Sequence, residues 1–168
     1  MANRPPRFPG FSYAGFNRYF LTICVDKRAP LFIDIELGQF VATQFLQLSV
    51  TFQFEVIAYC VMPDHIHILV AAQSEGCFLK PYVHRCKQAT GYNWKHDRRH
   101  HTRLWQEGFY DRILRDKDPT EGVIRYILEN PVRAGLVDDP REYPLIGAAN
   151  YDIDELLLAA MLWKPPWK

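Results

Sequence analysis

Two apolar segments joined by three turn-forming residues constrain the fold of this chain more than any other feature. FEVIAYCV (residues 54–61) and HIHILVAA (residues 65–72) are rich in the β-branched and aromatic residues that strands favour. Met62, Pro63 and Asp64 lie between them, and proline and aspartate are typical of tight turns. Two strands joined by so short a turn pair antiparallel. The sequence therefore predicts a hairpin, and with it an antiparallel sheet.

The rest of the chain alternates between strand-like and helix-like segments. We expect, in chain order, a strand over 19–25, helices over 35–48 and 80–95, a strand over 103–115 with a bulge at Gly108, a helix that begins at Pro119 and is ended by Pro131, and a helix over 153–162. The sequence contains neither internal repeats nor a glycine-rich phosphate loop. Hairpins mixed with helices favour an α+β fold, in which helices pack on an antiparallel β-sheet, over a doubly wound parallel sheet.

Length and composition indicate one globular domain over residues 1–168, because 168 residues with 48% hydrophobic content can bury a core unaided. Within it we expect a basic N-terminal arm over 1–17 and a C-terminal helix and tail over 146–168. No apolar run approaches the roughly 20 residues that cross a bilayer, and the first residues do not resemble a secretory signal. We therefore expect a cytoplasmic protein without a membrane partner. The four cysteines lack C-x-x-C spacing, which indicates reduced, packed thiols.

Basic residues are concentrated in one part of the sequence. The net charge is only +1, yet residues 80–115 contain nine lysines and arginines, four histidines and only three acidic residues. Such an asymmetry within one domain indicates a basic face that binds a polyanion. The alternative at this point is a solvated basic loop around KHDRRHH without any partner.

The predicted hairpin also carries two histidines, His65 and His67, in a strand otherwise made of apolar residues. Side chains alternate across a strand, so both imidazoles point to the same face, about 6.6 to 7 Å apart along the chain. They could converge on one cation, but two ligands do not hold a metal ion, so a third group is needed. The alternative is a pair of buried histidines that are hydrogen-bonded to core partners.

The helix that begins at Pro119 offers a third group. Tyr126 and Asn130 are four residues apart, so they share one flank of that helix, beside its apolar stripe. If this flank faces the histidine strand, Asn130 adds a carbonyl oxygen to the metal and Tyr126 places a phenol hydroxyl beside it. Two imidazoles, an amide oxygen and open water positions would suit Mg²⁺ or Mn²⁺. The alternative for Tyr126 is a partly buried aromatic residue without a chemical role.

Three segments resemble a known family. YCVMPDHIHILV, LWQEGFYDRILRD and YILENPVRAGLV, in this order, are similar to the single-tyrosine HUH transposases, and most of all to their REP-associated tyrosine transposase branch. The similarity runs from about Phe11 to Tyr143. The resemblance implies a ferredoxin-like HUH endonuclease fold, with His65 and His67 as metal ligands and Tyr126 as the nucleophile. Asn130 occupies the position of the third ligand, where relaxases of the wider group usually have a further histidine.

The activity implied by the resemblance is cleavage and rejoining of single-stranded or hairpin DNA through a 5′-phosphotyrosine. Tyr110 is a competing tyrosine, but it belongs to a predicted strand and we interpret it as packing. The predicted contacts to DNA come from basic and aromatic side chains: Arg85, Lys87, Arg98, Arg99, Trp105, Arg112, Arg115 and Arg133, with Tyr92, Trp94 and Phe109 also available for stacking. Bound to DNA, such a protein would be associated with the nucleoid. We expect a monomer in preference to a homodimer.

Two other functions remain open at this point. A domesticated protein could bind or process repeated palindromic hairpins without true transposition, and only the genomic surroundings of the gene would distinguish it from a mobile element. A metallohydrolase built on His-x-His is less favoured, because the sequence lacks the additional histidines and carboxylates that such sites assemble.

Overall fold

The computed structural model describes residues 16–115 and 118–162. Most of the predicted N-terminal arm and the WKPPWK tail therefore lie outside the described residues. The described chain forms a five-stranded sheet with the strand order β4-β1-β3-β2-β5. All recorded strand pairs are antiparallel, which confirms the predicted α+β class. The strands are β1 (Arg18–Cys24), β2 (Phe54–Met62), β3 (His65–Ala72), β4 (Tyr110–Leu114) and β5 (Ile146–Gly147).

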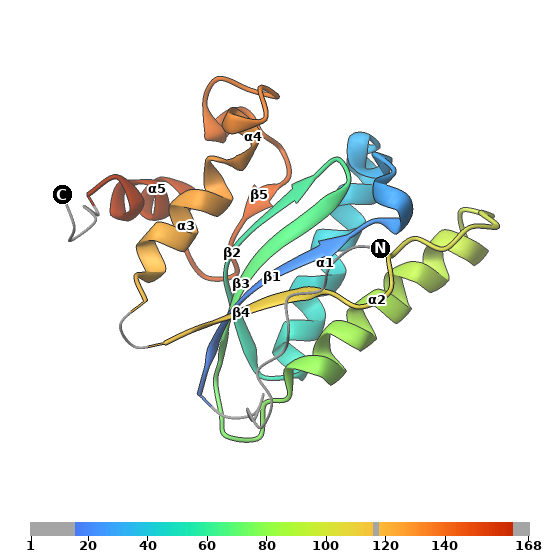
Figure 1. Ribbon diagram of the computed structural model, residues 1–168, viewed down its shortest axis with the longest axis horizontal. Coiled ribbons are helices and arrows are strands. Elements are labelled where there is room, and N and C mark those ends of the chain that lie inside the picture. The colour runs from blue at the N-terminus through green and yellow to red at the C-terminus, as the bar shows by residue number, and fades with distance from the viewer. Residues whose placement is uncertain (1–15, 116–117, 163–168) are drawn as a thin grey trace.

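Helices cover both faces of the sheet, so the molecule has three layers (Figure 1). α1 (Ile35–Thr51) and α2 (Leu79–His96) lie on one face, and α3 (Thr120–Leu128) lies on the other, with α5 (Ile153–Leu162) packed against it. A four-residue helix, α4 (Asn130–Arg133), directly follows α3. Three short 3₁₀ turns complete the described structure at Asp26–Arg28, Leu31–Ile33 and Pro140–Glu142. No helix in the described ranges is long and apolar enough to cross a membrane.

The predicted hairpin forms at the centre of this sheet. Met62 pairs with His65 and Cys60 with His67, and a register shift lies between Val56 and Ala58. β3 is buried over most of its length because helices cover both of its faces, which explains why its sequence is apolar rather than alternating. On β1 the alternation is visible: Tyr19, Leu21 and Ile23 are fully buried, and the intervening side chains face the α3 side.

One predicted strand is shorter than the sequence indicated. The predicted strand over 103–115 is a strand only at Tyr110–Leu114, and before it Trp105 makes a single bridge to Val25. Gly108 lies just before β4 with a φ of +72°, a conformation that favours glycine. Gly108 thus lies in the irregular segment before β4 and does not form a bulge inside a strand.

The prediction that Pro131 ends the tyrosine helix is wrong. α3 ends at Leu128, Glu129 separates the two helices, and Pro131 lies in the first turn of α4. A proline is tolerated there because the amide hydrogen it lacks would have no partner within the helix in any case. Tyr126 and Asn130 therefore belong to two consecutive helices and not to one continuous flank.

Candidate functional site

The two histidines of β3 direct one ring nitrogen each toward a common point. Their Nε2 atoms lie 3.0 Å apart, and their ring centroids are 4.5 Å apart at an interplanar angle of 78°. His67 is 5% exposed, and the side chain of His65 is 12% exposed. Both histidines therefore lie on one face of the strand, as the sequence predicts, and their side-chain rotamers bring the two imidazoles together.

The other nitrogen of each ring is held by a neighbouring side chain. Asp64 Oδ1 lies 2.6 Å from His65 Nδ1, and Arg28 Nε lies 2.8 Å from Asp64 Oδ2. Thr22 Oγ1 lies 2.9 Å from His67 Nδ1, across the β1–β3 pairing that makes these two residues register partners. Asp64 accepts the Nδ1 proton of His65, so the Nε2 of this ring carries a lone pair, which lies within hydrogen-bond distance of His67 Nε2.

Burial keeps both imidazoles neutral. Burial is the largest influence on the pKa of His65 and lowers it, whereas the hydrogen bond that His65 donates to Asp64 raises it. Burial is also the main cause for His67 and lowers its pKa to about 3, with further lowering from the nearby His65 ring and from Arg28. For Asp64, burial raises the pKa, but the hydrogen bond and charge of His65, with Arg28, leave it below its usual value. The site thus contains two neutral imidazoles beside an ionised carboxylate, the protonation state in which histidine binds metal ions.

Tyr126 of α3 lies over this pair in the same chain. Its ring centroid is 5.4 Å from that of His67 and 5.7 Å from that of Phe20, and Phe20 in turn is 5.3 Å from His67. The packing of α3 against β2 and β3 positions the ring there. Tyr126 is 40% exposed, so a large substrate can reach it. The structure therefore brings together the tyrosine and the histidines that the sequence marked as candidates.

Arg133 brings a positive charge to the tyrosine. Its guanidinium carbon lies 4.6 Å from the centroid of the Tyr126 ring, and its Nη2 donates to the Tyr126 carbonyl oxygen at 3.5 Å. Glu129 lies 3.8 Å from the same guanidinium. Arg133 is exposed, so it can reach an anionic substrate that binds next to the phenol.

The predicted third ligand, Asn130, is the first residue of α4 and is half-buried. Among the described residues no recorded interaction joins its side chain to His65 or His67. Within the same ranges no group of three or more His, Cys, Asp or Glu side chains could hold a metal ion. The role of Asn130 as a third ligand therefore stays a prediction.

The structure buries two of the aromatic residues predicted to stack on DNA and engages one predicted lysine with the backbone. Trp105 is 6% exposed and donates from Nε1 to Thr90 Oγ1 at 2.8 Å, so it belongs to the core and its ring is not available to a base. Trp94 is equally buried. Lys87 is half-buried, and its ammonium group donates to the carbonyl oxygens of Gln106 and Gly108, at 2.7 Å each. A sequence with many aromatic and basic residues does not show which of them the packing uses.

The remaining predicted contacts are distributed over two faces of the molecule. Arg112 is the register partner of Phe20, so it shares the sheet face of Tyr126, and it lies 3.5 Å from Asp118. Arg115 follows at the end of β4 and is exposed. Arg85 is exposed on α2, on the opposite face of the sheet, and Arg98 and Arg99 follow that helix. Arg98 forms an ion pair of 2.6 Å with Asp34.

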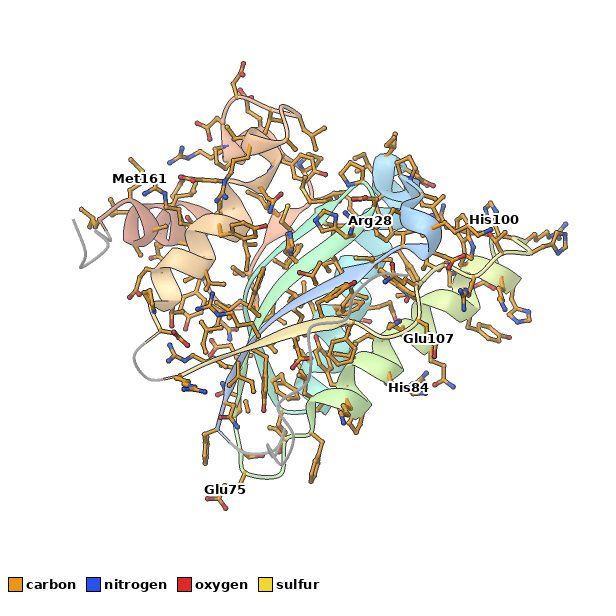
Figure 2. All side chains as sticks on the ribbon, viewed as in Figure 1. Arg28, Glu75, His84, His100, Glu107 and Met161 are labelled. Carbon is orange, nitrogen blue, oxygen red and sulfur yellow. The ribbon has the colours of Figure 1, made fainter. Side chains whose placement is uncertain are left out.

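Sequence reasoning missed the residues that orient the histidines, namely Thr22, Asp64 and Arg28. Asp64 fits a tight turn, but an acidic residue directly before the first histidine is also within reach of that imidazole. Figure 2 shows Arg28 close to the hairpin end that carries Asp64. Thr22 had no local signal, because its contact to His67 depends on the register between β1 and β3.

The antiparallel α+β sheet, with its histidine pair beneath a helical tyrosine, agrees with the single-tyrosine DNA transposases that the sequence motifs resemble. The sequence profile of the family described as "Transposase IS200 like" matches residues 17–130, which is more than half of the chain. The protein belongs to this family of DNA-processing enzymes.

Individual relatives agree with the profile. A Haemophilus influenzae protein named "Putative REP-associated tyrosine transposase" is 26% identical over 135 residues, which cover 75% of this chain and 76% of the relative. A second protein of that organism, named "Uncharacterized protein", is 24% identical over 158 residues, covering 77% and 88%. The solved structure described as "Structure of the REP associates tyrosine transposase bound to a REP hairpin" superposes with a TM-score of 0.69 at 19% identity, covering 84% of this chain and 82% of that chain. This last likeness shows that the fold is shared.

Proposed function

We propose that this protein cleaves and rejoins single-stranded or hairpin DNA through a covalent bond between Tyr126 and a 5′ phosphate, with a divalent metal ion bound by His65 and His67. The observation that carries the proposal is the 5.4 Å separation between the rings of Tyr126 and His67, above two Nε2 atoms that are 3.0 Å apart. The hairpin in the solved relative supports the choice of a hairpin substrate.

The tyrosine supplies the nucleophile. Its hydroxyl oxygen forms a bond to phosphorus while the bond from phosphorus to the 3′ oxygen breaks; the phenol loses its proton, and the departing 3′ oxygen takes one up. The positive charge of Arg133, 4.6 Å from the ring, favours the negative charge that develops on the phenol oxygen. Because the ester is retained in the protein–DNA link, attack by a second 3′ hydroxyl restores a DNA strand without ATP.

The residues present fit a divalent ion. The two Nε2 atoms lie 3.0 Å apart, so His65 and His67 would hold the ion through these atoms. Asp64 and Thr22 fix the ring orientations, and Asn130 is the proposed third ligand. When bound, Mg²⁺ or Mn²⁺ would neutralise charge on the non-bridging phosphate oxygens.

The test is a covalent-adduct assay with a hairpin oligonucleotide that has single-stranded flanks. We expect an adduct that resists denaturation in Mn²⁺ or Mg²⁺, none in EDTA, and a mass shift on the peptide that contains Tyr126. The variant Tyr126→Phe loses only the hydroxyl and should form no adduct.

Tyr110→Phe is the matched control. Tyr110 and His67 are both register partners of Thr22, so Tyr110 lies on the same sheet face, two strands away from the histidine. The control should retain adduct formation. An adduct that survives Tyr126→Phe, or one that forms equally in EDTA, would overturn the proposal. A wild-type protein that binds the hairpin tightly but forms no adduct would favour the domesticated binder.

A further inference from the structure

The helix α2 has an unusual charge composition for a helix at the protein surface. Its 18 residues, LKPYVHRCKQATGYNWKH, contain two histidines, four lysines and arginines, and no acidic residue. Solvated helices usually combine both signs, because oppositely charged residues four apart stabilise each other. The buried side of α2 faces the sheet through residues such as Tyr82, Val83 and Cys86, so its charges are displayed on the outer side. This helix thus presents a positive surface on the sheet face opposite Tyr126.

A groove runs between α2 and the irregular segment 103–109. It has a volume of about 630 Å³, and no acidic side chain is among its lining residues. The basic lining residues are Lys80, His84, Lys87, Lys95, His96 and Arg103, above a floor that includes Leu104 and Trp105. His84 projects from the outer side of α2 (Figure 2). A second hollow of about 530 Å³, lined by Arg85, Gln88, Ala89 and Tyr92, lies beside the first.

Tyr92 lines both hollows and is 62% exposed. Its ring stacks on that of His96, one helical turn further, with centroids 4.2 Å apart and an interplanar angle of 26°. The two rings form a flat aromatic surface that is open to solvent. Exposed aromatic rings within a basic groove are the combination that holds single-stranded nucleic acid, because bases stack on the rings while cations contact phosphates.

We propose that this groove, which we call the α2 groove, binds the single-stranded flank of the DNA substrate, with a base stacked on Tyr92 and phosphates next to Lys95, His84 and Arg103. The inference rests on the proposed function, which supplies a DNA substrate, and adds a second contact surface to it. An acidic protein segment would match the charge but would not use an open aromatic surface, so single-stranded DNA is the occupant that the groove fits best.

The edge of the sheet provides a route between the α2 groove and the surface around Tyr126. β4 is an edge strand, and it connects directly to the segment 103–109 that forms one wall of the α2 groove. On the other face of this edge, Arg112 lies beside Phe20, which contacts Tyr126. A DNA strand that leaves the tyrosine can therefore pass the exposed guanidinium of Arg112 and continue around the edge into the α2 groove.

The experiment compares DNA binding by Tyr126→Phe protein, which cannot cleave, with that of the same protein carrying Tyr92→Ala and Lys95→Gln. The probes are a hairpin without flanks and hairpins with a 5′ or a 3′ single-stranded flank, in EDTA and at several salt concentrations. For the flanked probe that the groove binds, we expect the affinity to fall by roughly 5- to 100-fold, because base stacking on Tyr92 is lost. We also expect the slope of the logarithm of the binding constant against the logarithm of the salt concentration to fall in magnitude by roughly 0.7, because one lysine–phosphate contact is lost. The flankless hairpin should bind equally well to both proteins.

A second measurement reports stacking directly. 2-Aminopurine placed along the flank should be quenched at one position by the parent protein and not by the Tyr92→Ala form. Arg141→Gln is the charge-matched control, since Arg141 pairs with Asp139 and Asp154 on a different part of the molecule, and it should change neither readout.

The outcomes separate the two proposals. If the flanks add no affinity, or if the double substitution changes neither affinity nor quenching, the α2 groove does not hold the DNA, whereas Tyr126-dependent adduct formation can still be observed with the wild type. If no hairpin forms an adduct with the wild type but the flank contact is measured, the proposed cleavage fails and the groove assignment stands.

Discussion

Removing the carboxylate of Asp64 should weaken metal binding without abolishing the fold. Asp64 Oδ1 lies 2.6 Å from His65 Nδ1 and holds this ring so that its Nε2 faces His67. Without it the imidazole can rotate or change tautomer, and its remaining nitrogen becomes a weaker ligand. Loss of such an orienting partner typically lowers metal affinity by about 10- to 100-fold, or about 1.4 to 2.7 kcal/mol of binding free energy.

The assay is calorimetric or electron-spin-resonance titration of the metal-free protein with Mn²⁺, so the readout does not depend on activity. Asp64→Ala should show the full loss. Asp64→Asn, which keeps an acceptor oxygen but removes the charge, should show a smaller one. Glu75→Gln is the control, because Glu75 is an exposed residue in the loop after β3, at the opposite end of the hairpin (Figure 2). Unchanged Mn²⁺ affinity in folded Asp64→Ala would refute the reasoning that Asp64 orients a metal ligand.

Two further predictions concern the core. Burial raises the pKa of the Cys60 and Cys86 thiols to about 12, so at pH 8 only about one in 10⁴ of each is a thiolate. We expect mass spectrometry to find both cysteines unmodified after iodoacetamide treatment of the native protein and alkylated after treatment in guanidinium. Rapid labelling of the native protein would contradict this prediction. Because the pKa of these thiols is higher in the folded than in the unfolded protein, their contribution to the free energy of unfolding is complete below about pH 9. This contribution is lost as the pH rises toward 12. The buried Tyr143 hydroxyl donates to the Val61 carbonyl at 2.8 Å. Tyr143→Phe should therefore lower the free energy of unfolding by about 1 to 3 kcal/mol, measured by urea titration. An unchanged urea midpoint would contradict a role of this hydrogen bond in anchoring the segment before β5.

Local patterns in the sequence were sufficient for most of the elements and for one part of the site. The Pro-Asp turn between two strand-like runs determined the hairpin, and strand alternation placed His65 and His67 on one face, because these properties depend only on neighbouring residues. The family of the chain was also accessible from its motifs, and the profile match confirms it. The same local reasoning failed at Pro131, since a proline interrupts a helix in its interior but is tolerated in the first turn of the next one.

The tertiary structure alone decided which surfaces meet. The sequence orients Tyr126 around the axis of its own helix, but only the packing of α3 on β2 and β3 brings its ring to 5.4 Å from His67. Trp105 is a core residue only because the segment that carries it folds back onto Thr90, and Lys87 is bound to backbone carbonyls of that same segment. Side-chain periodicity fixes the direction of a residue relative to its own strand or helix, whereas its partner depends on contacts between residues that are far apart in the chain.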